Sequence, residues 1–419
     1  MQATPEKHHD KYSAFRHSSY RRYFWARTIS SFGIQILSVS VAWQIYDETQ
    51  SAFLLGLIGL VQFLPALVLV VLTGIASDKL GRRMVMGCSI LVEMICAAGI
   101  FYLAITQQFN PVWVLTLLTL FGVARAFYSP AATSLAVNLV PREDFANAVG
   151  WNTSSWQLAS IVGPAAGGLL YGISGPFAYS VSVAMFIIGA GLIFSIPKPK
   201  QIIKKESANL DMILGGFKYI WKQKIVFGAI SLDLFAVLLG GAVALLPIYA
   251  RDILELGPTG LGLLRAAPGI GAIMMVFYLS SFPIKDHAGK ILFFTVAMFG
   301  LSTAIFGASK LAWVSILALI AVGAFDMISV YIREIILQLW TPDHVRGRVN
   351  AVNSIFLGAS NELGEFRAGM MAAVYGAVFT VVGGGVAAMG VAAIWAKLFP
   401  NLWGTRSLDD SPDVEFNDQ

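Results

Sequence analysis

The sequence predicts an all-helical polytopic membrane protein with twelve transmembrane helices in two pseudo-symmetric six-helix bundles. Of its 419 residues, 57% are hydrophobic and only 13% are charged, and the mean hydropathy is +0.70. A water-soluble chain of this length carries far more charge. Two further observations support the prediction: the apolar residues form twelve segments, and the second half of the chain repeats features of the first.

Each apolar segment is about 20 residues long or longer, which is the length that a helix needs to cross a bilayer. The segments cover residues 24–46, 52–76, 84–105, 111–139, 145–170, 175–196, 225–249, 259–281, 289–309, 311–339, 349–374 and 376–398. A polar stretch divides them into six and six. In chain order we therefore expect a cytoplasmic N-terminal tail at 1–22, a six-helix bundle at 23–196, a cytoplasmic central loop at 197–224, a second six-helix bundle at 225–398 and a cytoplasmic C-terminal tail at 399–419.

The positive charges indicate the orientation of the chain in the membrane. Lysines and arginines crowd into the tails, the central loop and alternate short loops, whereas the opposite loops carry only Arg251 and Lys310. Because such cations stay in the cytoplasm, both termini are predicted to be cytoplasmic in a multi-pass protein of the inner (plasma) membrane. The cations do not line one amphipathic face, so the net charge of +5 does not indicate a nucleic-acid partner. The loop from Met212 to Trp221 could form a helix on the inner membrane surface.

The two halves of the chain share residues at a constant offset of 201 positions. The matched pairs are Gly122 with Gly323, Asn152 with Asn353, Gly163 with Gly364, and Gly168 with Gly369. All of them fall at equivalent places in the two sets of six segments, which favours a duplicated six-helix unit. Parallel repeats of this kind are one of the known ways in which transporters are built.

Ionisable side chains within the apolar segments are costly in a bilayer and are therefore functional candidates. As proton-coupling or cavity residues we consider Glu93, Arg125, Asp326, Glu362, Glu365 and Arg367. Glu362 and Glu365 are three residues apart and share one helix face, where two neighbouring carboxyl groups favour holding a proton. No histidine lies in an apolar segment, so a proton relay would use carboxylates. The alternative is a helix-packing network in which Arg367 neutralises the two acids.

Arg125 and Asp326 correspond to each other under the offset. They are either facing groups across a central cavity or charges with separate partners in each half. A structural ion pair is an equally good interpretation of Arg125, and Glu93 is either a proton site or the partner of Arg125. Polar and aromatic residues that could line a substrate path are Gln35, Gln62, Asn152, Trp156 and Asn353.

Two short motifs interrupt the apolar pattern. The connection between the second and third segments concentrates charge and glycine, and we interpret it as a cytoplasmic gate motif of Gly74, Asp78, Gly81, Arg82 and Arg83. Its glycines permit a sharp turn. Within the fifth segment, a helix-bend motif consists of Gly163, Pro164, Gly167 and Gly168. Proline bends a helix, and the glycines let another helix approach closely.

With these motifs, the chain from about residue 15 to residue 400 resembles the major facilitator superfamily, and within it the enterobactin-exporter-like branch of siderophore and drug efflux proteins. The resemblance also rests on residues 14–16 and 27–30, and on Pro342 with residues 346–351 after the tenth segment. It implies a twelve-helix transporter with alternating access, usually driven by protons. It also implies that Asp78 and Arg82 brace the closed cytoplasmic side and that Arg125 assists proton transfer.

The chain departs from the family pattern at three places. Tyr128-Ser129 replaces the usual Gln-Gly after Arg125, and Ala159 replaces the first glycine of the antiporter motif. The acid that usually ends the fourth helix is missing, so Glu143 or Asp144 substitutes for it or the latch differs. These departures bear on the coupling mechanism and leave the predicted fold unchanged.

The function that the sequence predicts is secondary active export of a small organic amphipathic solute by proton antiport. An importer or facilitator on the same fold is the main alternative, and a membrane-embedded lipid-modifying enzyme is a weaker one because no intramembrane histidine could serve as its base. We expect no catalytic residue, metal site or cofactor. A glycine-rich lysine loop for ATP is missing from the sequence. The expected partners are the solute, protons and the lipid bilayer, with the protein acting as a monomer.

Overall fold

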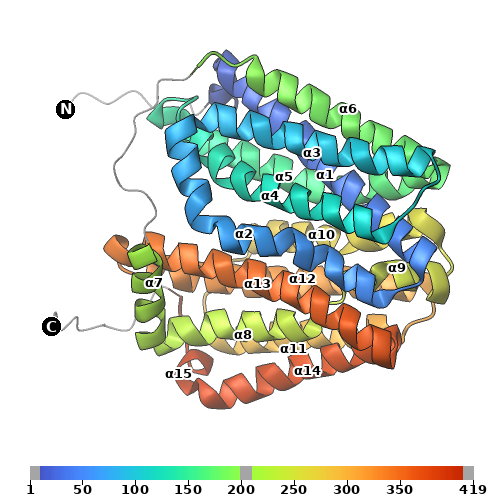
Figure 1. The fold of residues 1–419 in the computed structure, drawn as a ribbon. Coiled ribbons are helices and arrows are strands. Elements are labelled where there is room, and N and C mark those ends of the chain that lie inside the picture. Colours follow the sequence, from blue (N-terminus) through green and yellow to red (C-terminus); the bar gives the residue numbers. More distant parts are fainter. Residues whose placement is uncertain (1–9, 199–209, 409–419) are drawn as a thin grey trace, which may run out of the picture.

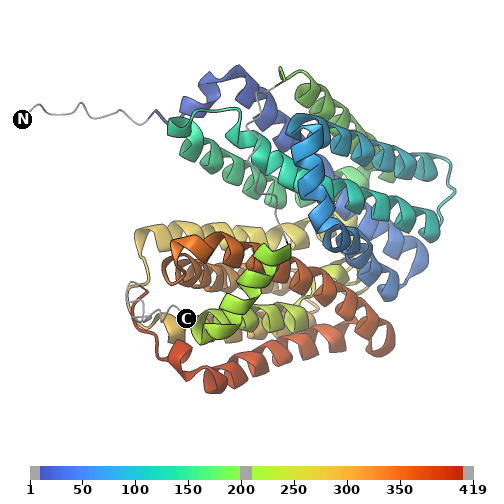
Figure 2. The same ribbon diagram turned by 60° about the vertical axis from the view of Figure 1, so that its left-hand side comes forward.

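The structure is a computed structural model that describes residues 10–198 and 210–408, with the side chains at 70–71, 74–75, 77–78, 210–214 and 343–344 outside the description. The described chain forms helices and connections without a strand. Two blocks of helices lie one above the other, the first drawn in blue to green and the second in yellow-green to red (Figures 1 and 2). Both described chain ends, at Asp10 and Leu408, lie on the side that we call the inner side.

The first block is a six-helix bundle preceded by a short 3-10 helix, η1 (Ser13–Arg16). Its helices are α1 (Ser18–Thr49), α2 (Ala52–Leu80), α3 (Arg82–Ile105), α4 (Pro111–Val137), α5 (Arg142–Ile173) and α6 (Gly175–Phe194). The chain breaks where the sequence offers caps. The side chains of Ser51, Asn110 and Ser174 accept hydrogen bonds from the first backbone N–H groups of α2, α4 and α6. Gly81, at φ +94°, makes the one-residue turn between α2 and α3.

The second block begins with a short helix in the central loop and continues with six membrane segments. The elements are α7 (Leu210–Lys222), α8 (Lys224–Gly240), η2 (Val243–Leu245), α9 (Leu246–Ile248), η3 (Tyr249–Ile253), α10 (Gly257–Ser281), α11 (Ala288–Ala308), α12 (Ala312–Leu339), α13 (Asp343–Tyr375), α14 (Ala377–Leu398) and α15 (Pro400–Trp403). The seventh predicted segment was expected to be one continuous helix. It is broken after Gly240, and η2, α9 and the π-helical η3 continue its path to the other side.

Length and composition support the membrane assignment. Within the described residues, ten helical spans are long and apolar enough to cross a bilayer. The two long helices that do not meet this criterion are α5 and α13, which carry more polar residues than the others. They pack within the bundles like the ten, and with them the twelve predicted segments all correspond to helices. Many large apolar side chains face outward, among them Trp113 at 61% exposure and Val374 at 73%.

The two bundles meet along two seams, α2 against α13 and α5 against α10. In both seams glycines bring the backbones together. A Cβ added at Gly56 of α2 would lie 3.0 Å from Cα of Gly369, and one added at Gly168 of α5 would lie 2.9 Å from Cα of Gly262. Gly168 and Gly369 are partners under the sequence offset, so the two seams are related by the internal repeat. The pseudo-symmetric arrangement of the two bundles is therefore confirmed.

Contacts between the bundles concentrate at the ends of the helices opposite the inner side, which we call the outer ends. There Arg251 of η3 forms a 2.8 Å ion pair with Asp47 of α1, and the hydroxyl of Tyr46 donates a hydrogen bond to Asp252. The ring of Phe53 of α2 packs near that of Phe366 of α13, with 6.3 Å between the ring centroids. The outer ends of the two bundles are thus joined by polar and aromatic contacts.

Candidate functional site

A pair of acidic side chains lies in the seam between α2 and α13. Glu362 and Glu365 of α13 both point toward Gly59 of α2, where a Cβ would lie 2.5 Å from Oε2 of Glu362 and 3.3 Å from Oε2 of Glu365. Both acids are half-buried, and they interact electrostatically with each other. The missing side chain at Gly59 therefore makes room for two carboxyl groups between the two halves of the molecule.

Two arginines from other helices surround this acidic pair. Arg265 of α10 interacts electrostatically with both acids, and its Nη1 donates a 3.1 Å hydrogen bond to Ser38 Oγ of α1. Arg125 of α4 interacts electrostatically with Glu362. Arg125 is exposed and has no hydrogen bond or ion pair within the described residues. The cluster thus combines charges from both bundles.

A small cavity of about 70 Å³ adjoins Arg125. Its polar lining includes three residues expected on a substrate path, Gln35, Gln62 and Trp156, and it also includes Ser38. Trp156 is 40% exposed, so its ring is accessible beside the guanidinium group of Arg125. An aromatic face, amide groups and a cation thus meet in one place, which is the chemistry that an amphipathic organic molecule with a ring would find complementary.

Glu93 of α3 is fully buried. Neither of its carboxyl oxygens has a hydrogen-bond partner among the described residues, although it interacts electrostatically with Arg125. Of the two alternatives for Glu93, a close pair with Arg125 is not what forms, and the two residues interact at longer range. Burying an isolated carboxylate is strongly unfavourable, so its position here marks Glu93 as a functional candidate.

Asp326 of α12 lies apart from Arg125, in a separate charge group of the second bundle. Its charged neighbours are Asp233 of α8 and Arg333 of α12. Asp233 and Arg333 form a 2.6 Å ion pair whose side chains are only 7% and 6% exposed. Asp326 thus has its charged neighbours within its own bundle, whereas Arg125 interacts with Glu93 of its own bundle and with Glu362 of the other.

Arg367 does not bind the acids beside it in the sequence. Its Nη2 donates a 2.7 Å hydrogen bond to the carbonyl oxygen of Leu239, near the C-terminal end of α8. Helix C-terminal ends leave backbone carbonyls without partners, and cations there are favourable. Arg367 thus stabilises the point where the seventh segment breaks, and the neutralising network expected between Arg367 and the two glutamates is not what forms.

The two matched asparagines lie near the inner side and pack against their own bundles. Tyr20 donates a 3.4 Å hydrogen bond to Asn152, and Asn353 donates one of 3.5 Å to Glu334. Both asparagines are only 5% and 6% exposed. Their equivalent positions express the internal repeat, and neither lines the cavity beside Arg125.

The helix-bend motif serves helix packing on two sides of α5, which continues as one helix through Pro164. A Cβ at Gly163 would lie 2.6 Å from Cβ of Gln35, and one at Gly167 would lie 3.0 Å from Cα of Ile36, both on α1. Gly168 faces α10 across the seam. The motif thus lets α5 approach α1 within its bundle and α10 in the other bundle.

The gate motif fastens its loop to the first bundle. Arg82 donates hydrogen bonds to the carbonyl oxygen of Ser134 and to Oδ1 of Asn138 at the end of α4, and Arg83 donates one to the carbonyl oxygen of Phe194 at the end of α6. The predicted roles of Gly74 and of the Asp78 side chain lie outside the described residues.

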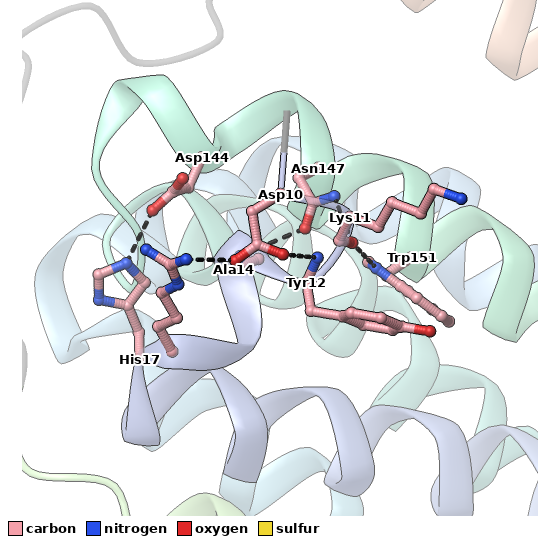
Figure 3. Close-up of polar contacts among 9 residues, drawn as sticks. Asp10, Lys11, Tyr12, Ala14, His17, Asp144, Asn147 and Trp151 are labelled. Carbon is pink, nitrogen blue, oxygen red and sulfur yellow. Dashed lines mark hydrogen bonds and ion pairs between the residues drawn. The ribbon is translucent and has the colours of Figure 1, made fainter. Parts of the chain in front are cut away.

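Asp144, which we considered as a substitute acid for the gate, binds the N-terminal segment. Its Oδ2 lies 2.9 Å from Nε2 of His17, and Asn147 and Trp151 of the same helix donate hydrogen bonds to the carbonyl oxygen of Lys11 (Figure 3). The hydrogen bond from His17 lowers the pKa of Asp144. The segment before α1 is therefore attached to the inner end of α5.

Several charged or polar residues were not among the site residues that the sequence singled out, namely Arg265, Ser38, Asp233 and Arg333. The three charged ones lie toward the ends of their apolar segments. A charge within an apolar segment was the available signal for each of these three, whereas a single serine gives none. Within the described residues, no group of three or more histidine, cysteine or acidic side chains could hold a metal ion.

Comparison with known proteins identifies the family. A major facilitator family model described as a transmembrane secretion effector matches residues 9–419. The chain belongs to the major facilitator superfamily. It shares 24% identity over 341 residues with the enterobactin exporter EntS of Shigella boydii serotype 4 (strain Sb227), across 80% of this chain and 81% of that protein. It shares 27% identity over 389 residues with the multidrug efflux pump Tap of Mycolicibacterium fortuitum, across 87% and 92%.

Solved structures agree with this membership at the level of the fold. A bacterial homologue of the human lysosomal transporter Spinster, in an inward-facing and unoccupied conformation, superposes with a TM-score of 0.73 at 12% identity. The superposition covers 92% of this chain and 98% of that one. The major facilitator transporter is thus all-helical and multi-pass, as the sequence predicted.

Proposed function

We propose that this transporter exports a small organic amphipathic solute across the inner membrane in exchange for protons. The observation that carries the proposal is the position of Glu362 and Glu365, which face Gly59 in the seam between the bundles. The proposal places both chain ends in the cytoplasm and the protein at work as a monomer. The export functions named for its relatives, of enterobactin and of several drugs, support the outward direction.

The seam explains how protons could bias the two arrangements of the bundles. Closing the outer ends encloses both acids between α2 and α13, and two charged carboxylates so close together in a low-dielectric interior repel each other. Protonation removes that cost, so it favours closure on the outer side. When the seam parts, the same acids meet external water and can take up protons.

Proton release on the inner side would depend on Arg125. This arginine is exposed and interacts electrostatically with Glu362, so it stabilises the ionised form of that acid. Arg265 acts in the same sense on both acids. The arginines thus favour loss of the protons once the inner side is open, and Glu93 is a second proton site in this account.

The solute would bind beside the same arginine. Gln35, Gln62 and the exposed ring of Trp156 line the cavity next to Arg125. Solute and proton sites then share one charged residue, which allows one to affect the affinity for the other. Exchange follows if the solute-bound form opens outward and the protonated form opens inward.

The test is solute accumulation by energised inside-out vesicles, with a fluorescent amphipath and a catecholate siderophore as substrates. We expect accumulation by the wild type to be abolished by a protonophore and by Glu362→Gln with Glu365→Gln. Asp326→Asn tests whether the separate charge group also takes part. Asp286→Asn is the control, because Asp286 is an exposed acid in the loop between α10 and α11 on the inner side. Accumulation that ignores the protonophore would contradict antiport and leave facilitated transport or import.

A further inference from the structure

Helix α7, in the central loop, lies across the inner ends of the second bundle. Figure 1 shows it running at a steep angle to α8 and α13, and Figure 2 shows it crossing the front of the same block. One face is buried: Ile220 is 2% exposed and packs in a cluster with Val226, Val349 and Val352. Because α8 begins only two residues after α7 ends, α7 lies where the membrane segments emerge.

An apolar flank of α7 remains exposed beside the buried face. Phe217 is 37% exposed and Trp221 is 75% exposed. The ring centroid of Phe217 lies 5.3 Å from that of Phe356 of α13, and the ring centroid of Trp221 lies 5.1 Å from that of Phe227 of α8. Both rings therefore pack against the sides of membrane helices. Tryptophan is enriched at the boundary between hydrocarbon and headgroups, where an apolar ring and a polar N–H are both accommodated.

A basic flank lies on the other side of the exposed face. Lys218 and Lys222 are one helical turn apart and exposed. Arg348 of α13 lies beside this flank, because a Cβ added at Gly215 would lie only 3.3 Å from its Nη1. The lack of a side chain at Gly215 leaves room for the guanidinium group. Within the described part of the chain, none of these three cations forms an ion pair. Like charges at this spacing repel each other, so an anion bound between them would stabilise the arrangement.

We propose that Lys218, Lys222 and Arg348 bind the headgroup of an anionic phospholipid in the cytoplasmic leaflet, with Trp221 and Phe217 against its acyl chains. An apolar flank next to a basic flank, at the level where membrane helices end, matches a lipid with a negative headgroup. A folded protein or a nucleic acid would satisfy the cations and leave the aromatic flank against the bilayer unexplained. The basic flank and the aromatic flank together therefore favour a lipid as the ligand.

The site joins α7 to α13. Gly216 packs against the backbone of Arg348, where a Cβ would lie 2.6 Å from its carbonyl oxygen. A lipid held by both elements would fix α7 onto the inner end of the helix that carries Glu362 and Glu365. The lipid site does not depend on proton coupling, because it rests on the contacts at the inner surface alone.

Hydrogen–deuterium exchange of the full chain in nanodiscs tests this site. We compare discs of phosphatidylcholine with discs that also contain phosphatidylglycerol, and we follow the exchange of α7. We expect phosphatidylglycerol to slow exchange in α7 of the wild type. Lys218→Gln with Lys222→Gln should lose this effect, and lipid retention in native mass spectrometry should fall about fivefold per lysine, since each contributes about 1 kcal/mol.

A matched control removes two exposed lysines elsewhere on the inner side, Lys285→Gln with Lys290→Gln, and it should behave as the wild type. Lys218→Arg with Lys222→Arg should keep the effect and shows that the helix still folds. Equal exchange of α7 in both kinds of disc would overturn the proposal. Protection by inorganic phosphate in phosphatidylcholine discs, equal to that by phosphatidylglycerol, would also overturn it and identify a site for free anions.

Discussion

Glu362 of α13 rests on Gly59 of α2, and its carboxyl oxygen occupies the place that a side chain at Gly59 would take. The contact joins the two bundles through an acid on one side and the lack of a side chain on the other. Because the obstructing atom is the far end of a flexible side chain, Gly59→Ala should displace the carboxyl group while leaving the fold intact.

The first prediction follows from that contact. In Gly59→Ala, the Glu362 carboxyl group moves away from its place between the charges, and proton-driven transport should fall about tenfold, which corresponds to about 1.4 kcal/mol. Transport by reconstituted protein measures this change. Gly390→Ala is the control, since no atom lies within 4 Å of its Cβ position. Equal loss in both variants would show that the effect is not specific to the seam.

The second prediction concerns the other seam. A Cβ at Gly168 would lie 2.5 Å from the carbonyl oxygen of Pro258 and 2.9 Å from Cα of Gly262, and these backbone atoms cannot turn aside. Gly168→Val should therefore force α5 away from α10 and reduce closure of the outer ends. A short thiol-reactive cross-linker between Asp47→Cys and Arg251→Cys measures closure, and its yield should fall. Unchanged yield would contradict this role of Gly168.

The third prediction concerns the ion pair at the outer ends. Asp47 and Arg251 are 43% and 32% exposed, so each single substitution to a neutral residue should weaken outer closure by about 1 kcal/mol or less. The reversal Asp47→Arg with Arg251→Asp should restore part of it. Spin-label distances across the outer ends report the populations. A reversal no better than the single variants would show that the pair does not stabilise closure.

The fourth prediction concerns Asp233 and Arg333. Both side chains are almost fully buried, so Arg333→Met leaves a buried acid without its partner and should cost about 3–5 kcal/mol of stability. Changing both residues, as Asp233→Asn with Arg333→Met, should cost less than the single change. Thermal unfolding of the purified protein in detergent compares the variants. Equal loss in the single and double variants would contradict the pairing.

The fifth prediction concerns the segment before α1. The hydrogen bond from His17 lowers the pKa of Asp144, so the ionised acid favours the attached segment. That stabilisation is present above the pKa of aspartate in the unfolded chain, and it is lost as the pH falls through the lowered value. The protection factors of the amides at residues 10–17, which correct the exchange rate for its intrinsic dependence on pH, should therefore fall in acid. In Asp144→Asn, the protection factors should be low at neutral pH and nearly independent of pH in this range.

The sequence predicted the twelve segments from their long apolar runs. It also predicted that the two halves correspond, because glycines recur at a constant offset between them. The carboxyl pair could also be predicted, since Glu362 and Glu365 share a face of one helix. Arg265 reaches that pair because α10 and α13 belong to the same bundle, and its contact with Ser38, 227 residues away, depends on how the two bundles pack together. A pattern along one helix carries no information about which residues of other helices it contacts.

Two other features depended on contacts that the sequence does not encode locally. The break after Gly240 lies in an apolar run, so hydropathy shows one continuous segment there, although Gly240-Gly241 and Pro247 are local signals for a break. Asp144 was considered for the gate because of its place after α4, whereas the folded chain brings His17 to it. In both cases the deciding group, Arg367 or His17, lies more than a hundred residues away.

The most direct test of the central claim is proton movement in proteoliposomes that contain the purified protein and a trapped pH dye. An outward-directed gradient of transported solute should draw protons inward in the wild type. Glu362→Gln with Glu365→Gln should abolish this proton flux and keep solute binding, because Arg125 and Trp156 remain in place. Solute movement without any proton flux in the wild type, or undiminished flux in the double variant, would contradict the account.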